Sequence, residues 1–144
     1  MTAKYIRVIA ICVFQHGDKI LVFEHFDKSR GTPFYRPLGG GLEFGETTEQ
    51  ALKREIKEEI DQEITDLKLL TVLENIFTLE GETGHEIVYV YDAHFTDKAA
   101  YQREVFTVHE ETETLKATWR SLDSFNDYHR LVPEALVTLL KTKR

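Results

Sequence analysis

The chain has 144 residues, of which 42% are hydrophobic and 30% are charged, a composition typical of a folded domain and unlike that of a disordered protein. Lysine and arginine number 18 against 25 aspartate and glutamate residues, so the net charge is −7. Nucleic acid polymers and anionic membranes both require a basic surface, and neither is therefore expected as a partner. The one cysteine, Cys12, excludes an internal disulfide and a cysteine-based zinc site.

The beginning of the chain predicts a β-hairpin and then a long loop. Residues 6–14 are apolar and β-branched, and a turn at 16–19 separates them from a second apolar run at 20–23. Residues 27–41 contain two prolines and four glycines, which predicts a loop over the whole segment. The first apolar run is too short to cross a membrane and lacks the features of a signal peptide, so we expect a cytoplasmic protein.

The remaining elements predict a mixed α and β domain. Residues 47–60 are expected to form a helix, because Thr47 and Gln50 fit a capping box and no proline follows. Strands are expected at 67–79, 86–95 and 115–122, whereas the polar segment 97–113 is left unassigned. A last helix is expected to begin near Pro133, since proline is tolerated in a first helical turn. No linker or repeat divides the chain, which predicts one domain over residues 1–144.

The central helix is expected to carry an acidic face. At 100° per residue, Glu55, Glu58 and Glu59 share an arc of about 100°. An apolar stripe beside them would pack on a sheet. Like charges at this spacing oppose the helix, and a hard cation between them would remove that cost. The alternative is a solvated acidic surface whose charge neighbouring lysine and arginine residues compensate.

The surrounding residues favour the cation site. The chain reads Gly40, five residues, Glu46, seven residues, and then Arg54-Glu55-Ile56-Lys57-Glu58-Glu59. This spacing resembles the signature of the Nudix hydrolases, in which a glycine and an aliphatic residue normally follow the last glutamates. Here those two positions hold Asp61 and Gln62, which departs from the family pattern at the end of the helix. The proline that usually precedes the paired glycines is replaced by Leu38.

The resemblance implies a fold and an activity. The implied fold is a Nudix-type α/β/α sandwich with a mixed β-sheet. The implied activity is a Mg²⁺-dependent pyrophosphohydrolase that cleaves a nucleoside diphosphate linked to another moiety, such as a nucleotide sugar, a dinucleotide or a nucleoside triphosphate. The implied metal ligands, for Mg²⁺ with Mn²⁺ as the other candidate ion, are Gly40, Glu55, Glu58 and Glu59. The implied catalytic set is Glu58, Glu59 and Arg54, in which Arg54 orients a glutamate.

Two other classes of function remain open at this point. A non-catalytic nucleotide-sensing domain could share the fold, although such a domain would be expected to lack the glutamates that are all present here. An acidic interaction module would show no dependence on metal. The expected partner is a small nucleotide, with no nucleic acid polymer and no membrane, and a homodimer is compatible with the sequence.

Further candidate residues lie outside the helix. The substrate-binding candidates are Tyr35, Arg36 and Gly39, and burial in the core is the alternative for the tyrosine ring. A later loop carries carboxylates that could assist as ligand or base, namely Glu110, Glu111 and Glu113. Glu86 is another candidate, with an exposed position at the start of a strand as its alternative.

Overall fold

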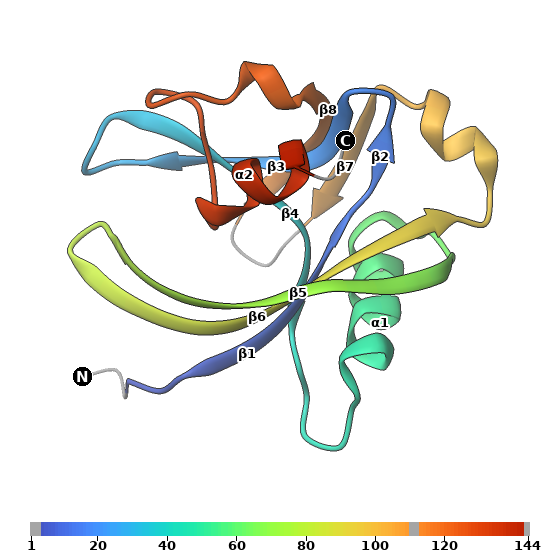
Figure 1. The fold of residues 1–144 in the computed structure, drawn as a ribbon, viewed down its shortest axis with the longest axis horizontal. Coiled ribbons are helices and arrows are strands. Elements are labelled where there is room, and N and C mark those ends of the chain that lie inside the picture. The colour runs from blue at the N-terminus through green and yellow to red at the C-terminus, as the bar shows by residue number, and fades with distance from the viewer. Residues whose placement is uncertain (1–3, 110–112, 143–144) are drawn as a thin grey trace.

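The computed structural model describes residues 4–109 and 113–142 of the chain. The helices are α1 (Thr48–Ile60) and α2 (Ala135–Thr142) (Figure 1). The strands are β1 (Arg7–Val13), β2 (Gln15–His16), β3 (Lys19–Asp27), β4 (Thr32–Gly41), β5 (Ile64–Leu79), β6 (Glu82–Phe95), β7 (Val105–His109), β8 (Thr114–Ser121) and β9 (Arg130–Leu131). Short 3-10 helices cover Lys98–Gln102 and Leu122–Ser124. Within this part of the chain, no helix has the length and apolar character needed to cross a membrane.

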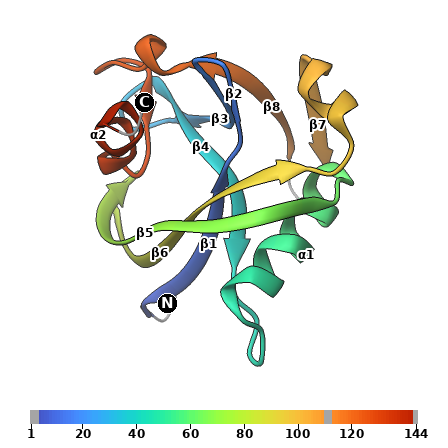
Figure 2. The ribbon, with the colours of Figure 1, turned by 45° about the vertical axis from the view of Figure 1, so that its right-hand side comes forward.

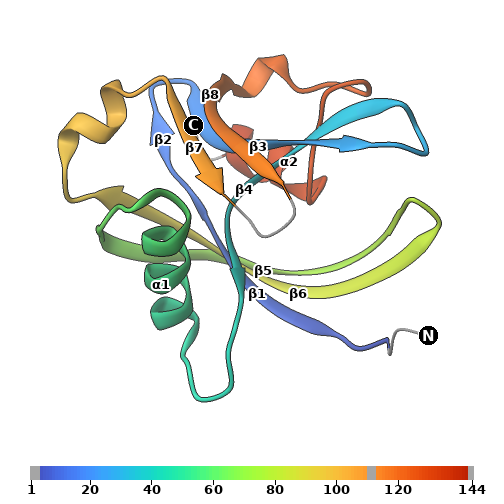
Figure 3. The same cartoon turned by 180° about the vertical axis from the view of Figure 1, so that it is seen from behind.

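The strands form one mixed sheet in the order β5-β6-β1-β4-β3-β8-β7. Strands β1 and β6 run parallel, and the other neighbours along this path are antiparallel. Strand β4 joins the two halves, because residues 32–37 pair with β3 and residues 38–41 pair with β1. The β3–β4 and β5–β6 hairpins project beyond the rest of the sheet on one side of the molecule (Figures 1 and 3).

Alternation along β1 builds a separate core on each face of the sheet. Ala10 and Cys12 face the core that contains Leu52 and Ile56 of α1. The side chains between them face the other core, which contains Leu136 and Leu140 of α2. The two helices therefore cover opposite faces, as Figure 2 shows, and the expected α/β/α sandwich is confirmed.

The prediction of a loop over residues 27–41 is wrong. Strand β3 extends to Asp27, and β4 occupies residues 32–41, so that only the turn between them is irregular. The two prolines misled the prediction because proline cannot donate a ladder hydrogen bond. Pro33 and Pro37 lie where β4 has a partner strand on one side only, since β9 pairs with residues 34 and 35 and β1 begins its pairing at Leu38.

The other predicted elements are present with shifted bounds, but the expected first hairpin is reduced to β2 pairing with β3, since β1 pairs with β4 and β6 instead. Helix α1 begins with the expected capping box and ends at Asp61, which adopts left-handed geometry with φ 53°. Asparagine and aspartate accept this conformation more readily than most residues, so the missing family glycine does not prevent the helix from ending here. The segment left unassigned contains one 3-10 helix and β7, and α2 starts two residues after Pro133.

Candidate active site

Helix α1 carries the acidic face to the point where β4 crosses to β1. Leu52 and Ile56 are fully buried against the sheet, and this anchoring fixes the rotation of the helix. Glu55 and Glu59 then lie beside the glycines at the end of β4, half-buried, whereas the Glu58 side chain remains 60% exposed. The periodicity of the sequence therefore placed these carboxylates correctly on one side of the helix.

Arg54 ties the acidic residues to one another and to the strand. Its Nε and Nη2 donate to the two carboxylate oxygens of Glu46 at 2.7 and 2.8 Å, a bidentate pair. Its Nη1 donates to Glu55 at 3.0 Å and to Glu58 at 3.3 Å. Nη2 also donates to the carbonyl of Gly41 at 3.1 Å. One guanidinium group thus fixes three glutamates and the end of β4, and we call this set the Arg54 network.

The Arg54 network shifts the pKa values of its members in different directions. The hydrogen bonds from Arg54 lower the pKa of Glu46 to about 2. The same bonds raise the pKa of Arg54 above its usual value. Burial raises the pKa of Glu55, and its pairing with Arg54 opposes only part of this rise. Glu46 is therefore a firmly ionised anchor, whereas Glu55 carries a carboxylate whose charge is costly without a cation.

The glycines of β4 allow the backbone to approach both glutamates. The N–H of Gly39 donates to Glu59 at 3.1 Å. Gly39 has φ 142°, and a Cβ there would lie 2.1 Å from the carbonyl oxygen of Ala10. A Cβ at Gly40 would lie 2.5 Å from Cδ of Glu55, in the space that the carboxylate fills. Any side chain at either position would displace a strand or a candidate ligand.

The donor set of this site is suited to a hard divalent cation. Carboxylate and backbone carbonyl oxygens are the ligands that Mg²⁺ prefers. In residues 4–109 and 113–142, no three acidic, histidine or cysteine side chains converge as a ready-made metal cluster. Mg²⁺ commonly uses one or two carboxylates and completes its shell with water and substrate phosphates, so an open arrangement of this kind fits it.

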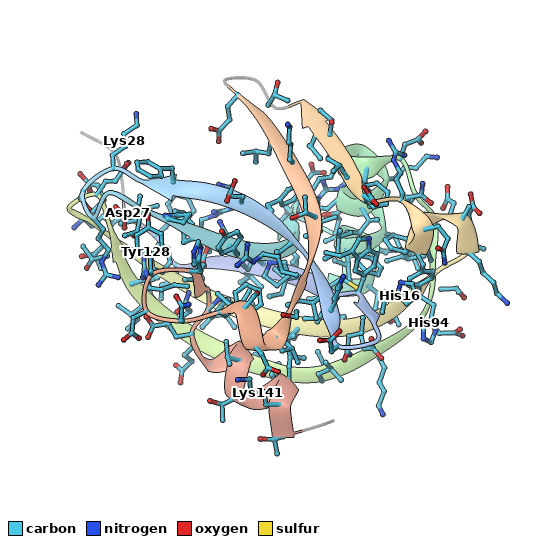
Figure 4. The ribbon with its side chains drawn as sticks, turned by 90° about the horizontal axis from the view of Figure 1, so that it is seen from above. His16, Asp27, Lys28, His94, Tyr128 and Lys141 are labelled. Carbon is cyan, nitrogen blue, oxygen red and sulfur yellow. The ribbon has the colours of Figure 1, made fainter. Side chains whose placement is uncertain are left out.

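A cavity lies between the two projecting hairpins and the segment that leads into α2. It measures about 70 Å³ and, through the shared residues Asn75, Phe77 and Arg130, adjoins a more open hollow of about 340 Å³. Its lining includes Phe34, Arg36, Asn75, Phe77, Glu86 and Arg130. The hairpin tips are linked, because the N–H of Lys28 donates to the Glu80 carboxylate at 3.1 Å. Figure 4 shows Lys28 at one end of the molecule, remote from His16 and His94 at the other.

Arg7 lies between the cavity and the Arg54 network. Its Nη1 is 3.7 Å from Oε2 of Glu86, which lines the cavity. A Cβ built on Gly41, the residue whose carbonyl binds Arg54, would lie 3.1 Å from Nη2 of Arg7. The two sites are therefore neighbours, and Arg36 adds a second guanidinium 4.0 Å from Glu86. Sequence reasoning singled out Arg36 and missed Arg7.

The other candidates from the sequence lie in varied positions. The Tyr35 ring is only 2% exposed and packs in the α2 core, where its hydroxyl group contacts Glu24 and His129, so the ring is not presented to a nucleobase. Glu86, for which an exposed position was the alternative, is 4% exposed. Glu113 is exposed beside β8, and Glu110 and Glu111 lie outside the described residues.

Comparison with known proteins gives one family. The model of the NUDIX domain matches residues 4–140. A MutT NUDIX hydrolase from Burkholderia pseudomallei is 24% identical, with a TM-score of 0.69 over 95% of this chain and 98% of that one. A NUDIX hydrolase from Nitrosomonas europaea is 22% identical, with a TM-score of 0.63 over 95% and 87%. A UDP-X diphosphatase is 17% identical, with a TM-score of 0.62 over 100% and 67%.

Proposed function

The chain belongs to the Nudix hydrolase family, and we propose that it hydrolyses the phosphoanhydride bond of a nucleoside diphosphate linked to another moiety, with Mg²⁺ as the cofactor. The observation that supports this most directly is the contact of Glu55 and Glu59 with the β4 glycines. That contact brings two carboxylates to a backbone that a polyphosphate can approach closely. We further propose that the chain acts as a single domain in the cytoplasm.

The residues divide into ligands and positioning groups. We expect Glu55, Glu58, Glu59 and the carbonyl of Gly40 to hold the cation. When bound, Mg²⁺ would neutralise phosphate charge and favour attack at phosphorus. The Glu59 carboxylate, fixed by the Gly39 N–H, would accept a proton from the attacking water as the bridging P–O bond breaks. Arg54 touches glutamates and not the reacting atoms, so it is a positioning residue.

The cavity next to this site supports a nucleotide as the substrate. Arg36 lines the cavity and Arg7 lies between the cavity and Gly41, where guanidinium groups would pair with phosphate oxygens. The aromatic side chains of Phe34 and Phe77 line the hollow and would accept a flat ring. Cleavage of a UDP derivative by a structural neighbour is compatible with this class of substrate.

The first prediction tests the chemistry. Glu59→Gln preserves size and the helix but removes the charge, so turnover at saturating nucleotide and Mg²⁺ should fall by about a hundredfold or more. Release of nucleoside monophosphate from a panel of nucleoside diphosphate derivatives would measure it. The matched control is Glu49→Gln, an exposed carboxylate in the first turn of the same helix, which should turn over like the parent. A Glu59→Gln protein with half of the parent rate would contradict the assignment.

A further inference from the structure

Glu86 is a buried carboxylate whose polar contacts among the described residues are all long. Asn75 donates to its Oε1 at 3.5 Å, and the guanidinium groups of Arg7 and Arg36 lie 3.7 and 4.0 Å from its Oε2. Its side chain is nevertheless 95% buried and lines the cavity described above. An ionised carboxylate accepts about four hydrogen bonds, so most of the capacity of Glu86 is unused by the side chains around it.

Asp27, the other buried acidic residue among those described, makes a useful contrast. Its Oδ1 accepts the Ser29 hydroxyl at 2.7 Å and two backbone N–H groups at 3.0 and 3.2 Å. Those short bonds fix the tight turn between β3 and β4, which accounts for its burial. The polar contacts of Glu86 are longer than any of these bonds. A buried carboxylate with so few short bonds can accept further hydrogen bonds, and the Glu86 carboxylate lines the cavity from which they could come.

The rest of the cavity is suited to a flat heterocycle. Phe34 and Phe77 supply aromatic surface, and Phe34 is itself held by stacking on His25 at a centroid distance of 5.1 Å. Donors are present as well, because Arg36 and Arg130 line the same space. Nε of Arg130 is buried and has no hydrogen-bond partner among the described residues. The lining thus combines apolar walls, one acceptor carboxylate and several donors.

We propose that this cavity selects a guanine base, with the Glu86 carboxylate accepting N1–H and N2–H and the nearby guanidinium groups donating to the oxygen and ring nitrogen of the base. Guanine presents two adjacent N–H donors, which match the two oxygens of one carboxylate. Adenine and cytosine present one amino donor beside an unprotonated ring nitrogen, and uracil presents one N–H between two carbonyl groups. Each of these would leave a carboxylate oxygen facing an acceptor.

This inference rests on the proposed function for the identity of the site, and it names the substrate class as guanine nucleotides. It can be tested without turnover. Guanosine, inosine, adenosine and uridine monophosphates contain no phosphoanhydride bond, so their binding is independent of hydrolysis. GMP and IMP differ only in the 2-amino group that would reach Glu86. Equilibrium dialysis or calorimetry on the full chain with Mg²⁺ gives the dissociation constants.

We expect the parent to bind GMP at least about tenfold more tightly than IMP, and AMP and UMP more weakly still, because a site that bonds a donor discriminates against an analogue without it. Glu86→Gln should bring the ratio of GMP to IMP affinity close to one. The control is Glu82→Gln, an exposed carboxylate on the same strand, which should retain the parent ratio.

Two outcomes would overturn the inference. Equal affinity of the parent for GMP and IMP is sufficient by itself, and this comparison requires no variant to fold. A Glu86→Gln protein that melts cooperatively and retains the guanine preference would equally exclude Glu86 as the acceptor. A failure of the proposed function would look different. A protein that binds GMP selectively but cleaves no guanine nucleotide would support the base site and contradict the proposed hydrolysis.

Discussion

The Arg54 network and the surroundings of Glu86 contain the same types of residue, but they differ in how fully their hydrogen-bonding capacity is used. We call the Arg54 network the saturated cluster and the residues around Glu86 the unsaturated cluster. Arg54 donates to three glutamates and one carbonyl, with every bond at 3.3 Å or less. Glu86 has two arginines and an amide nearby, and each of these three contacts is at 3.5 Å or more. Short, bidentate contacts fix geometry, whereas long contacts around a buried charge leave it able to receive a ligand.

This difference matches the different tasks of the two clusters. Chemistry at phosphorus needs carboxylates held in place before the substrate arrives, because displacements near 1 Å are costly to the rate. Recognition of a base needs an acceptor whose bonds are completed only by the correct partner. The comparison therefore predicts that damage to the first cluster reduces turnover and stability together, while damage to the second changes selectivity.

The largest effect is expected from removing the centre of the saturated cluster. Arg54→Gln would leave Glu46, Glu55 and Glu58 without their shared cation, so turnover should fall roughly a hundredfold and the melting temperature by several degrees. Arg7→Gln should leave the melting temperature almost unchanged, because Arg7 is half exposed and only 3.7 Å from Glu86. Steady-state kinetics and thermal melts measure both, with the exposed Lys53→Gln as the control on the same helix.

Two results would contradict this contrast between the Arg54 network and the residues around Glu86. An Arg54→Gln protein with the parent turnover would mean that the glutamates are positioned without the network. Equal losses of melting temperature in Arg54→Gln and Arg7→Gln would mean that the long contacts of Glu86 contribute as much to stability as the short bonds of Arg54.

The sequence predicted part of the saturated cluster, because the spacing of the helix glutamates is local information. Glu46, Arg54 and the helix glutamates lie within 14 residues of one another, and a capping box with helical periodicity fixes where each side chain points. The departure at Asp61 was also readable, since aspartate accepts the left-handed conformation more readily than most residues. The family resemblance implied that Arg54 orients a glutamate, whereas the bidentate pair of Arg54 with Glu46 was not predicted.

The cavity was not predictable in the same way, because it is built by pairing between distant strands. Glu86 pairs with Arg7 on β1 and with Asn75 on β5. The sequence of a single segment does not predict such a register, because it depends on how distant strands pair. One signal was present and went unused. Glu86 shares its alternation with the buried residues Val88 and Val90, which places it on an inward face. For Tyr35 the structure shows burial, the alternative that the sequence left open, in a strand that the expected loop did not predict.

A smaller effect is expected from the adjacent residues Gly40 and Gly41, which differ in what an added Cβ would meet. Gly40→Ala would place a Cβ 2.5 Å from Cδ of Glu55, so the carboxylate must move and the Mg²⁺ concentration for half-maximal activity should rise roughly tenfold. Gly41→Ala would meet only the end of the flexible Arg7 side chain at 3.1 Å, and the Mg²⁺ requirement should stay near that of the parent. Mg²⁺ titrations of both variants give the comparison. Identical requirements would show that the Gly40–Glu55 contact does not set the metal site.

The smallest effect is expected on the melting temperature at acidic pH, and it depends on the Glu46 carboxylate. Arg54 lowers the pKa of Glu46 to about 2 from an ordinary value of 4.5. A lowered folded-state pKa means that the ionised group stabilises the fold above pH 4.5 and that this contribution is lost as the pH falls toward 2. The melting temperature of the parent should therefore exceed that of Glu46→Gln by a constant margin above about pH 5, and the margin should shrink on further acidification.

Melting curves of the parent and Glu46→Gln between pH 7 and pH 2.5 measure this margin directly. Glu55 titrates in the opposite sense, because burial raises its pKa, but it is present in both proteins and its contribution largely cancels in the difference. Glu49→Gln provides the control, since this carboxylate is exposed and lies outside the Arg54 network. A margin between the parent and Glu46→Gln that stays constant down to pH 2.5 would mean that Arg54 does not bind the Glu46 carboxylate in solution. The contrast between the two clusters would then be contradicted at the Arg54–Glu46 pair, which has the shortest bonds.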